Sequence, residues 1–169
     1  MNPVPSGLHP FTVSRILTIE ELPAPPAAGL SHDKVYLRFV NIFPGDAARG
    51  FVPYYHFRIL VAGNLDVGHI NFRVGDTAHV RTCAGHIGYE IAEPFRGHGF
   101  AGQACRALAP FARDFYAEVT ITCDPANLAS KRTIEKLGAR FVDEVLVPPD
   151  DSPDERGARA KVRYRWALR

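Results

Sequence analysis

The stretch of sequence that most constrains the fold runs from Gly85 to Ala101. It reads as an extended segment, GHIGYEIAEPF, followed by the turn RGHG and then by an alanine-rich helix. Gly97 and Gly99 let the backbone turn tightly, and the first N–H groups of the helix point at the turn together with the positive end of the helix dipole. A strand, a glycine turn and a helix in this order predict a site for a pyrophosphate or a similar oxyanion.

Alternating apolar residues predict four strands before this turn. Apolar side chains recur at every second position in the ranges 35–39, 55–61, 70–74 and 87–91, which is the period of a strand with one buried face. The connections at 62–66 and 75–77 are short and rich in turn residues. The four strands are therefore expected to form an antiparallel meander.

After the turn the pattern becomes helical and then alternates again. Spacings of three and four predict a helix from Ala101 to about Phe115, with a kink or a new turn at Pro110. The segment EVTITC at 118–123 predicts a strand parallel to strand 86–91, because a helical crossover joins the two. A helix over 127–137 that ends at Gly138, and strands at 140–147 and 160–168 around the polar loop PPDDSPDERG, complete the prediction.

Composition excludes several classes of protein. A chain of 169 residues with 46% hydrophobic content can bury one core, so residues 1–169 are expected to form a single domain. The formal charge of +2, without a basic run, gives no electrostatic case for binding nucleic acid or an anionic membrane.

Three cysteines without C-x-x-C spacing favour neither a disulfide framework nor a zinc site, so no metal is expected. The sequence shows no signal-peptide pattern and no apolar run near the ~20 residues of a membrane span, which predicts a cytoplasmic protein.

The glycine turn also satisfies a second motif. Residues 97–102 read G-x-G-x-x-G, and Asp124 ends the next predicted strand, as in a dinucleotide-binding fold. Against that reading, four antiparallel strands come first, the residues EPFR separate the strand from the glycines, and little chain follows Asp124. A nicotinamide oxidoreductase and a loop without a ligand stay as alternatives for the function of this turn.

Two motifs together resemble the acetyl-CoA site of the GNAT N-acetyltransferase superfamily. They are R-x-x-G-x-A at 96–101 with Pro94 upstream, and N-x-x-S followed by E-K-L-G in the range 127–138. The resemblance covers about residues 54–147 and implies an α/β (α+β) fold, with a mixed, mostly antiparallel sheet and a central splayed parallel strand pair flanked by helices. It also implies acetyl-CoA as cosubstrate and, as acceptor, a primary amine of a small molecule or of a peptide or protein N-terminus.

A narrower resemblance is to a branch of uncharacterised predicted acetyltransferases near the ribosomal-protein N-terminal acetyltransferase type. It rests on G-H-I-G-Y before the turn, I-T-C-D-x-x-N after it, and R-Y-R-W near the C-terminus. This similarity supports the fold and the cofactor but says nothing about the acceptor.

The resemblance assigns the cofactor residues. Main-chain groups of Ile91 and Ala92 would hold the pantetheine arm, and Asn127 and Ser130 match positions near it. The pyrophosphate would be surrounded by Arg96, Gly97, His98, Gly99, Phe100, Ala101 and Gly102. Helix capping explains Asn127 and Ser130 equally well, and Arg96 could be a solvated surface charge.

The chemistry requires a neutral amine. A lysine-like amine with a pKa of about 10.4 costs roughly 4–5 kcal/mol to deprotonate at pH 7, so a base or a water wire is needed. His86, Gly88 and Glu90 share the polar face of the strand that ends at the turn. Glu90 is the first candidate for the base and His86 the second. The alternatives are a structural Glu90 paired with Arg73 and a buried core His86.

A second polar face supplies candidates for acceptor binding. His69, Asn71 and Arg73 share one face of the preceding strand. If the two strands are neighbours, their polar faces coincide close to the thioester. A sheet covered on both sides rarely carries so many polar groups without a use.

The sequence departs from the family in two places. Many members carry a tyrosine in the helix after the asparagine, where this chain has Ile134; Tyr89 or Tyr55 would then protonate the thiolate, or solvent would, given a thiol pKa of about 8.5. A non-catalytic acyl-CoA-binding or sensing module therefore stays an alternative. Residues 20–53 are rich in Pro and Gly where the family has two helices that help to build the acceptor pocket. An exposed C-terminal strand leaves a homodimer open.

Overall fold

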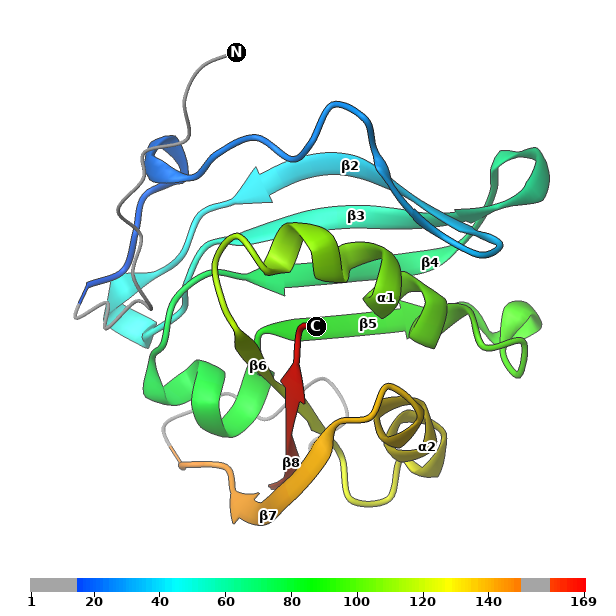
Figure 1. Ribbon diagram of the computed structural model, residues 1–169. Helices are drawn as coiled ribbons and strands as arrows, with labels where there is room; N and C mark the ends of the chain where they lie inside the picture. Colours follow the sequence, from blue (N-terminus) through cyan, green and yellow to red (C-terminus); the bar gives the residue numbers. More distant parts are fainter. Residues whose placement is uncertain (1–14, 150–158) are drawn as a thin grey trace.

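The computed structural model describes residues 15–149 and 159–169, which form one eight-stranded sheet with two α-helices (Figure 1). Most of the polar loop predicted at 148–157 lies outside the described residues. In chain order the elements are β1 (Leu30–His32), β2 (Val35–Phe43), β3 (Tyr54–Val61), β4 (Leu65–Arg73), β5 (Ile87–Ile91), α1 (Phe100–Ala112), β6 (Glu118–Cys123), α2 (Leu128–Lys136), β7 (Arg140–Leu146) and β8 (Ala160–Ala167). The spatial order of the strands is β1-β2-β3-β4-β5-β6-β8-β7.

The predicted antiparallel meander is confirmed in β2 to β5. β1 adds a short edge strand that the sequence pattern did not predict. The first predicted turn is tight, with Gly63 and Asn64 in the left-handed region. The prediction of a short connection at 75–77 is wrong, because residues 74–86 join β4 to β5 and include a π-helical turn, Val80–Ala84. At the start of this turn Thr77 Oγ1 accepts the N–H of Val80.

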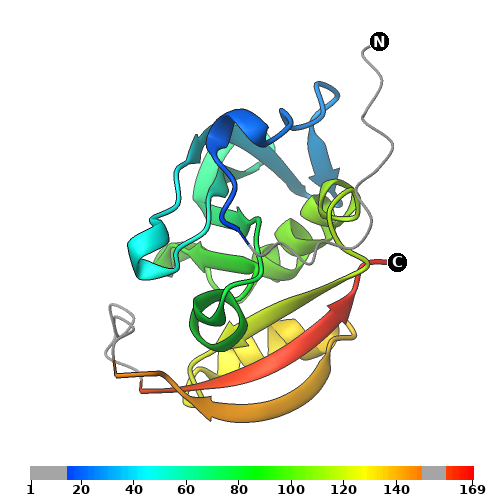
Figure 2. The ribbon, with the colours of Figure 1, turned by 90° about the vertical axis from the view of Figure 1, so that its left-hand side faces the viewer.

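The predicted parallel pair is confirmed in β5 and β6. Their only register pair is Ile87 with Ile121, so the two strands separate beyond that point. In the side view of Figure 2, the strands coloured olive to red (β6, β8, β7) lie together below β2 to β5. The mixed sheet with a splayed central pair is the predicted fold.

Helix α1 forms the crossover between the parallel strands and covers the sheet. It is continuous through Pro110, which has no N–H and so removes one helical hydrogen bond, the one to the carbonyl oxygen of Arg106. Its buried face packs on the sheet through the ring of Phe111, whose centroid lies 5.0 Å from that of Tyr55 and 6.1 Å from that of Phe72. Burial of such rings anchors β3 and β4 under the helix.

Both α-helices pack against one hydrophobic core and hence against one face of the sheet. In the described part of the chain no α-helix covers the opposite face, because both α-helices, α1 and α2, lie on the first face. That face carries the partly exposed polar residues of β3, β4 and β5. The expected cover on both sides is therefore not found, and the described residues leave this polar face, called the open face below, without a helix over it.

The C-terminal strand is not an exposed edge. β8 lies between β6 and β7, so β7 is the edge strand, with Phe141 57% and Leu146 79% exposed. The expectation of an exposed C-terminal strand is wrong, so β8 is not available to pair across a homodimer. No helix in residues 15–149 or 159–169 is long and apolar enough to cross a membrane.

Candidate cofactor cleft and acceptor face

A cleft of about 760 Å³ opens between the end of β5, the N-terminal half of α1 and the length of α2. Nine of the predicted cofactor residues line it: Ile91, Arg96, Gly97, Gly99, Phe100, Ala101, Gly102, Asn127 and Ser130. Ala92 and His98 do not line the cleft. The ring of His98 instead stacks on Phe100, with the centroids 5.5 Å apart.

The glycine turn leaves the start of α1 available to a ligand. Gly99 is the N-cap residue in the left-handed conformation (φ +75°), and no side chain caps the first N–H groups of the helix. Arg96 is tied to the end of β5, because its Nε donates to the carbonyl oxygen of Ile91 at 2.9 Å. Unpaired N–H groups at the positive end of a helix, beside a fixed guanidinium, form an anion site.

Cations that the motif did not single out extend this anion site. Arg106, Arg132 and Lys136 line the cleft together with Arg96, and Glu90 is the one carboxylate among the described lining residues. Arg106 Nη2 also donates to the carbonyl oxygen of Lys136 at 2.8 Å, which joins α1 to α2. The spacing of Arg132 and Lys136, four residues apart on a predicted helix, is the signal that could have found them.

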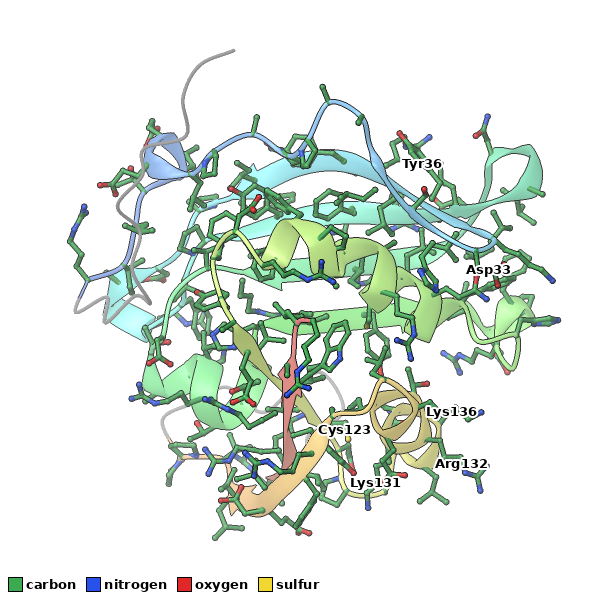
Figure 3. The ribbon with its side chains drawn as sticks, in the orientation of Figure 1. Asp33, Tyr36, Cys123, Lys131, Arg132 and Lys136 are labelled. Carbon is green, nitrogen blue, oxygen red and sulfur yellow. The ribbon has the colours of Figure 1, made fainter. Side chains whose placement is uncertain are left out.

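The side chains of α2 divide between two directions. Figure 3 shows Arg132 and Lys136 projecting from α2 on the side of the turn after β5, whereas Lys131 projects elsewhere. Lys131 Nζ donates to the carbonyl oxygen of Pro125 at 3.2 Å and does not line the cleft.

Asn127 is both the N-cap of α2 and a cleft residue. Its Oδ1 accepts the N–H of Ser130 at 3.0 Å, so the capping alternative is present in the structure. Ser130 Oγ in turn shares a hydrogen bond with the hydroxyl of Tyr89 at 2.9 Å. The cap therefore fixes a hydroxyl pair on the wall of the cleft.

Tyr89 is the tyrosine that the structure brings into the cleft. Burial raises the pKa of its hydroxyl above the usual range, so the group is protonated at neutral pH. Tyr55 is fully buried and donates to the carbonyl oxygen of Pro23 at 2.6 Å, and Ile134 lies in the core. Neither of these two positions could supply an acid to the cleft.

The two predicted polar faces coincide. In the β4–β5 register His69 lies opposite Glu90 and Asn71 opposite Gly88. Glu90 is exposed, and burial, together with the neighbouring His56 and Arg58, lowers the pKa of His69, which is therefore neutral at pH 7.

The alternative of a Glu90–Arg73 ion pair is contradicted. Among the described residues no ion pair joins Glu90 to Arg73. Arg73 Nη1 instead donates to the carbonyl oxygen of Ala84 at 3.3 Å.

His86 lies apart from this group. Its side chain is 4% exposed, its ring packs on Tyr116 with the centroids 4.6 Å apart, and its Nδ1 accepts the N–H of Thr120 at 3.0 Å. Burial is the main cause that lowers its pKa to about 4. This placement is that of a core histidine, the alternative to its role as a base.

The residues described offer no metal centre. Within residues 15–149 and 159–169, no three His, Cys, Asp or Glu side chains lie close enough to share an ion.

Solved structures with a similar fold are acetyltransferases. One is the microcin C7 self-immunity acetyltransferase MccE in complex with acetyl-CoA and AMP (18% identity, TM-score 0.54, covering 68% of this chain and 61% of that one). Another is a GNAT-family acetyltransferase from Bacillus anthracis (17% identity, TM-score 0.57, covering 83% and 98%). A third is the ribosomal L7/L12 α-N-protein acetyltransferase RimL with coenzyme A (20% identity, TM-score 0.52, covering 68% and 62%). At these identities the likeness concerns the fold.

The family itself follows from the sequence. No curated protein sequence matches this chain. The model of the acetyltransferase (GNAT) domain matches residues 23–140, which is most of the chain and includes the glycine turn, the parallel strands and α2. The chain therefore belongs to the GNAT acetyltransferase family.

Proposed function

We propose that the protein is an acetyl-CoA-dependent N-acetyltransferase that acetylates a primary amine by direct attack in a ternary complex. The observation that carries this proposal is the charge of the cleft. Four cations and an uncapped helix N-terminus line a cleft that opens where two parallel strands separate. Coenzyme A has a matching shape, with phosphates at one end and a linear amide-containing arm at the other.

The cleft suggests one orientation for the cofactor. The pyrophosphate would lie against the N–H groups at the start of α1 and Arg96, and the 3′-phosphate against Arg132 and Lys136. The pantetheine arm would then enter the gap between β5 and β6. Ile91, at the open end of β5, has an N–H that β6 does not pair, and this group would bond to the arm as to a neighbouring strand, while its carbonyl oxygen accepts from Arg96.

The open face of the sheet would receive the amine. Its nitrogen attacks the thioester carbonyl carbon, the C–N bond forms and the C–S bond breaks, and the CoA thiolate leaves. The surplus amine proton passes to Glu90, directly or through water, with the neutral His69 beside it. Tyr89, a protonated hydroxyl on the cleft wall, would return a proton to the thiolate.

A non-catalytic acyl-CoA-binding module is the second candidate. The observation that favours it is the buried Ile134 at the place where many relatives carry a tyrosine acid. Such a module would bind acetyl-CoA without consuming it in the presence of any amine.

Initial-rate kinetics test whether the protein transfers the acetyl group and whether both substrates must be bound before transfer. Thiol release from acetyl-CoA should require an amine and should give intersecting double-reciprocal lines when both substrates are varied, because both must be bound before transfer. Parallel lines together with an isolable acetylated protein would contradict direct attack. Binding of acetyl-CoA without release across a broad amine panel would favour the module.

A further inference from the structure

Arg73 is a cation on the open face of the sheet, and residues 15–149 and 159–169 supply no counter-charge to it. Arg73 is partly buried, and its one hydrogen bond within the described part of the chain joins Nη1 to the carbonyl oxygen of Ala84 at 3.3 Å. No carboxylate in the described residues pairs with it. Buried charges are normally paired, and a guanidinium has five N–H donors. Most of its donor capacity is therefore free for an anionic ligand.

The position of this guanidinium is fixed by its neighbours. The ring of Tyr54, its register partner on β3, lies 6.0 Å from the guanidinium carbon. On the other side, a Cβ placed on Gly88 would lie 3.0 Å from Nη1, so the absent side chain leaves the guanidinium its room. Gly88 directly follows Ile87, the last point at which β5 pairs with β6. Arg73 thus lies over the place where the parallel strands begin to separate.

The charged side chains of the open face differ in whether a described residue of opposite charge already pairs with them. Arg58, which lies opposite His69 on β3, is already neutralised by Asp66 through two hydrogen bonds of 2.8 Å. Glu90 follows Gly88 by two residues along β5, which is roughly 7 Å at the rise of an antiparallel strand. A cation and a carboxylate base therefore flank the point at which the thioester is proposed to lie.

We infer that the acceptor is an amino-carboxylic acid, a small amine whose carboxylate, a few bonds from the nitrogen, is bound by Arg73. The carboxylate would supply the missing counter-charge through a bidentate pair, and the amine would lie between Arg73 and Glu90. A peptide N-terminus has an amide in place of this carboxylate and would leave the guanidinium unpaired. The inference rests on the proposed function and narrows its substrate class.

Matched acceptor pairs test the inference on the unaltered protein. Amino acids should be compared with their own carboxamides and with dipeptides that begin with the same residue. We expect kcat/KM to be about 10- to 100-fold higher for the free acids, the range of a charge-assisted hydrogen-bond pair. Carboxamides or dipeptides that react as well as the free acids would overturn the inference and leave the acetyltransferase activity in place.

Substitutions of Arg73 test whether this residue causes the preference for free acids over amides. Arg73→Gln should raise KM for the acids and bring the acid-to-amide ratio close to one, with KM for acetyl-CoA unchanged. Arg73→Lys should restore part of the ratio, because lysine keeps the charge but not the planar fork. Arg38→Gln, a change of the same kind at an exposed position of β2, is the control and should keep the full ratio. An Arg73→Gln protein that keeps the ratio would contradict the inference.

A binding measurement tests the carboxylate site at Arg73 independently of the proposed acetyltransferase activity. N-acetyl amino acids and their carboxamides should be titrated into the CoA-loaded protein by calorimetry. Tighter binding of the acids, lost in Arg73→Gln, supports the carboxylate site even if no amine is turned over, in which case the proposed activity alone fails. Equal binding of the acid and the amide would reject the site.

Discussion

Replacement of Glu90 by glutamine is expected to lower kcat by about 10²- to 10⁴-fold, the usual contribution of a positioned general base. Glutamine keeps the shape of the side chain and cannot accept the amine proton. Glu90 is exposed and has no ion pair among the described residues, so the protein should stay folded and should still bind CoA. The measurement is single-turnover acetyl transfer with saturating acetyl-CoA.

The control for this variant is Glu93→Gln. Glu93 is an exposed carboxylate on the turn that follows β5 and does not line the cleft, so its replacement should leave kcat close to that of the unaltered protein. Full activity in Glu90→Gln would remove Glu90 as the base and leave a water wire to His69 as the route for the proton.

Acid is expected to destabilise the protein through His86. Burial favours the neutral ring, with a folded-state pKa of about 4 against about 6.5 in the unfolded chain. Below pH 6.5 the unfolded chain takes up the proton first, so stability that is complete above that pH falls as the pH approaches 4. Between pH 7.5 and 4.5 this one group should remove roughly 2–3 kcal/mol from the free energy of unfolding.

Urea unfolding at the two pH values measures this loss. His86→Gln keeps an acceptor for the N–H of Thr120 but cannot be protonated. Its free energy of unfolding should therefore fall by roughly 2–3 kcal/mol less on acidification than that of the unaltered protein. His98→Gln, at an exposed position, should behave like the unaltered protein. Identical pH dependence in His86→Gln and the unaltered protein would show that His86 does not titrate in this way.

The fold could be predicted from the sequence where local patterns and topology agree. Alternation located β2 to β5, and a helical crossover made β5 and β6 parallel. β1 was missed because three residues are too few for a periodic signal. The π-helical turn at 80–84 was missed because the glycine and aspartate before it are also typical of a short hairpin.

The site could be predicted only in part, because motifs describe backbone geometry better than side-chain environment. The glycine turn gave six of the residues that line the cleft, and strand alternation placed His69 and Glu90 on polar faces that coincide. Burial of His86 against Tyr116 depends on a contact between segments 30 residues apart, which no local pattern reports. The spacing of Arg132 and Lys136 could have placed these two cations on one helix face, but the packing of that helix beside α1 arises only in the folded chain.

The central claim is that the cleft between β5, α1 and α2 holds CoA with its 3′-phosphate against α2. Calorimetric titration with CoA and with dephospho-CoA, which lacks that phosphate, tests it most directly. We predict one site per chain, with CoA bound about 10- to 100-fold more tightly than dephospho-CoA. The double variant Arg132→Gln/Lys136→Gln should lose this preference, and Lys131→Gln on the same helix should keep it. Absence of CoA binding, or a preference that survives the double variant, would contradict the account.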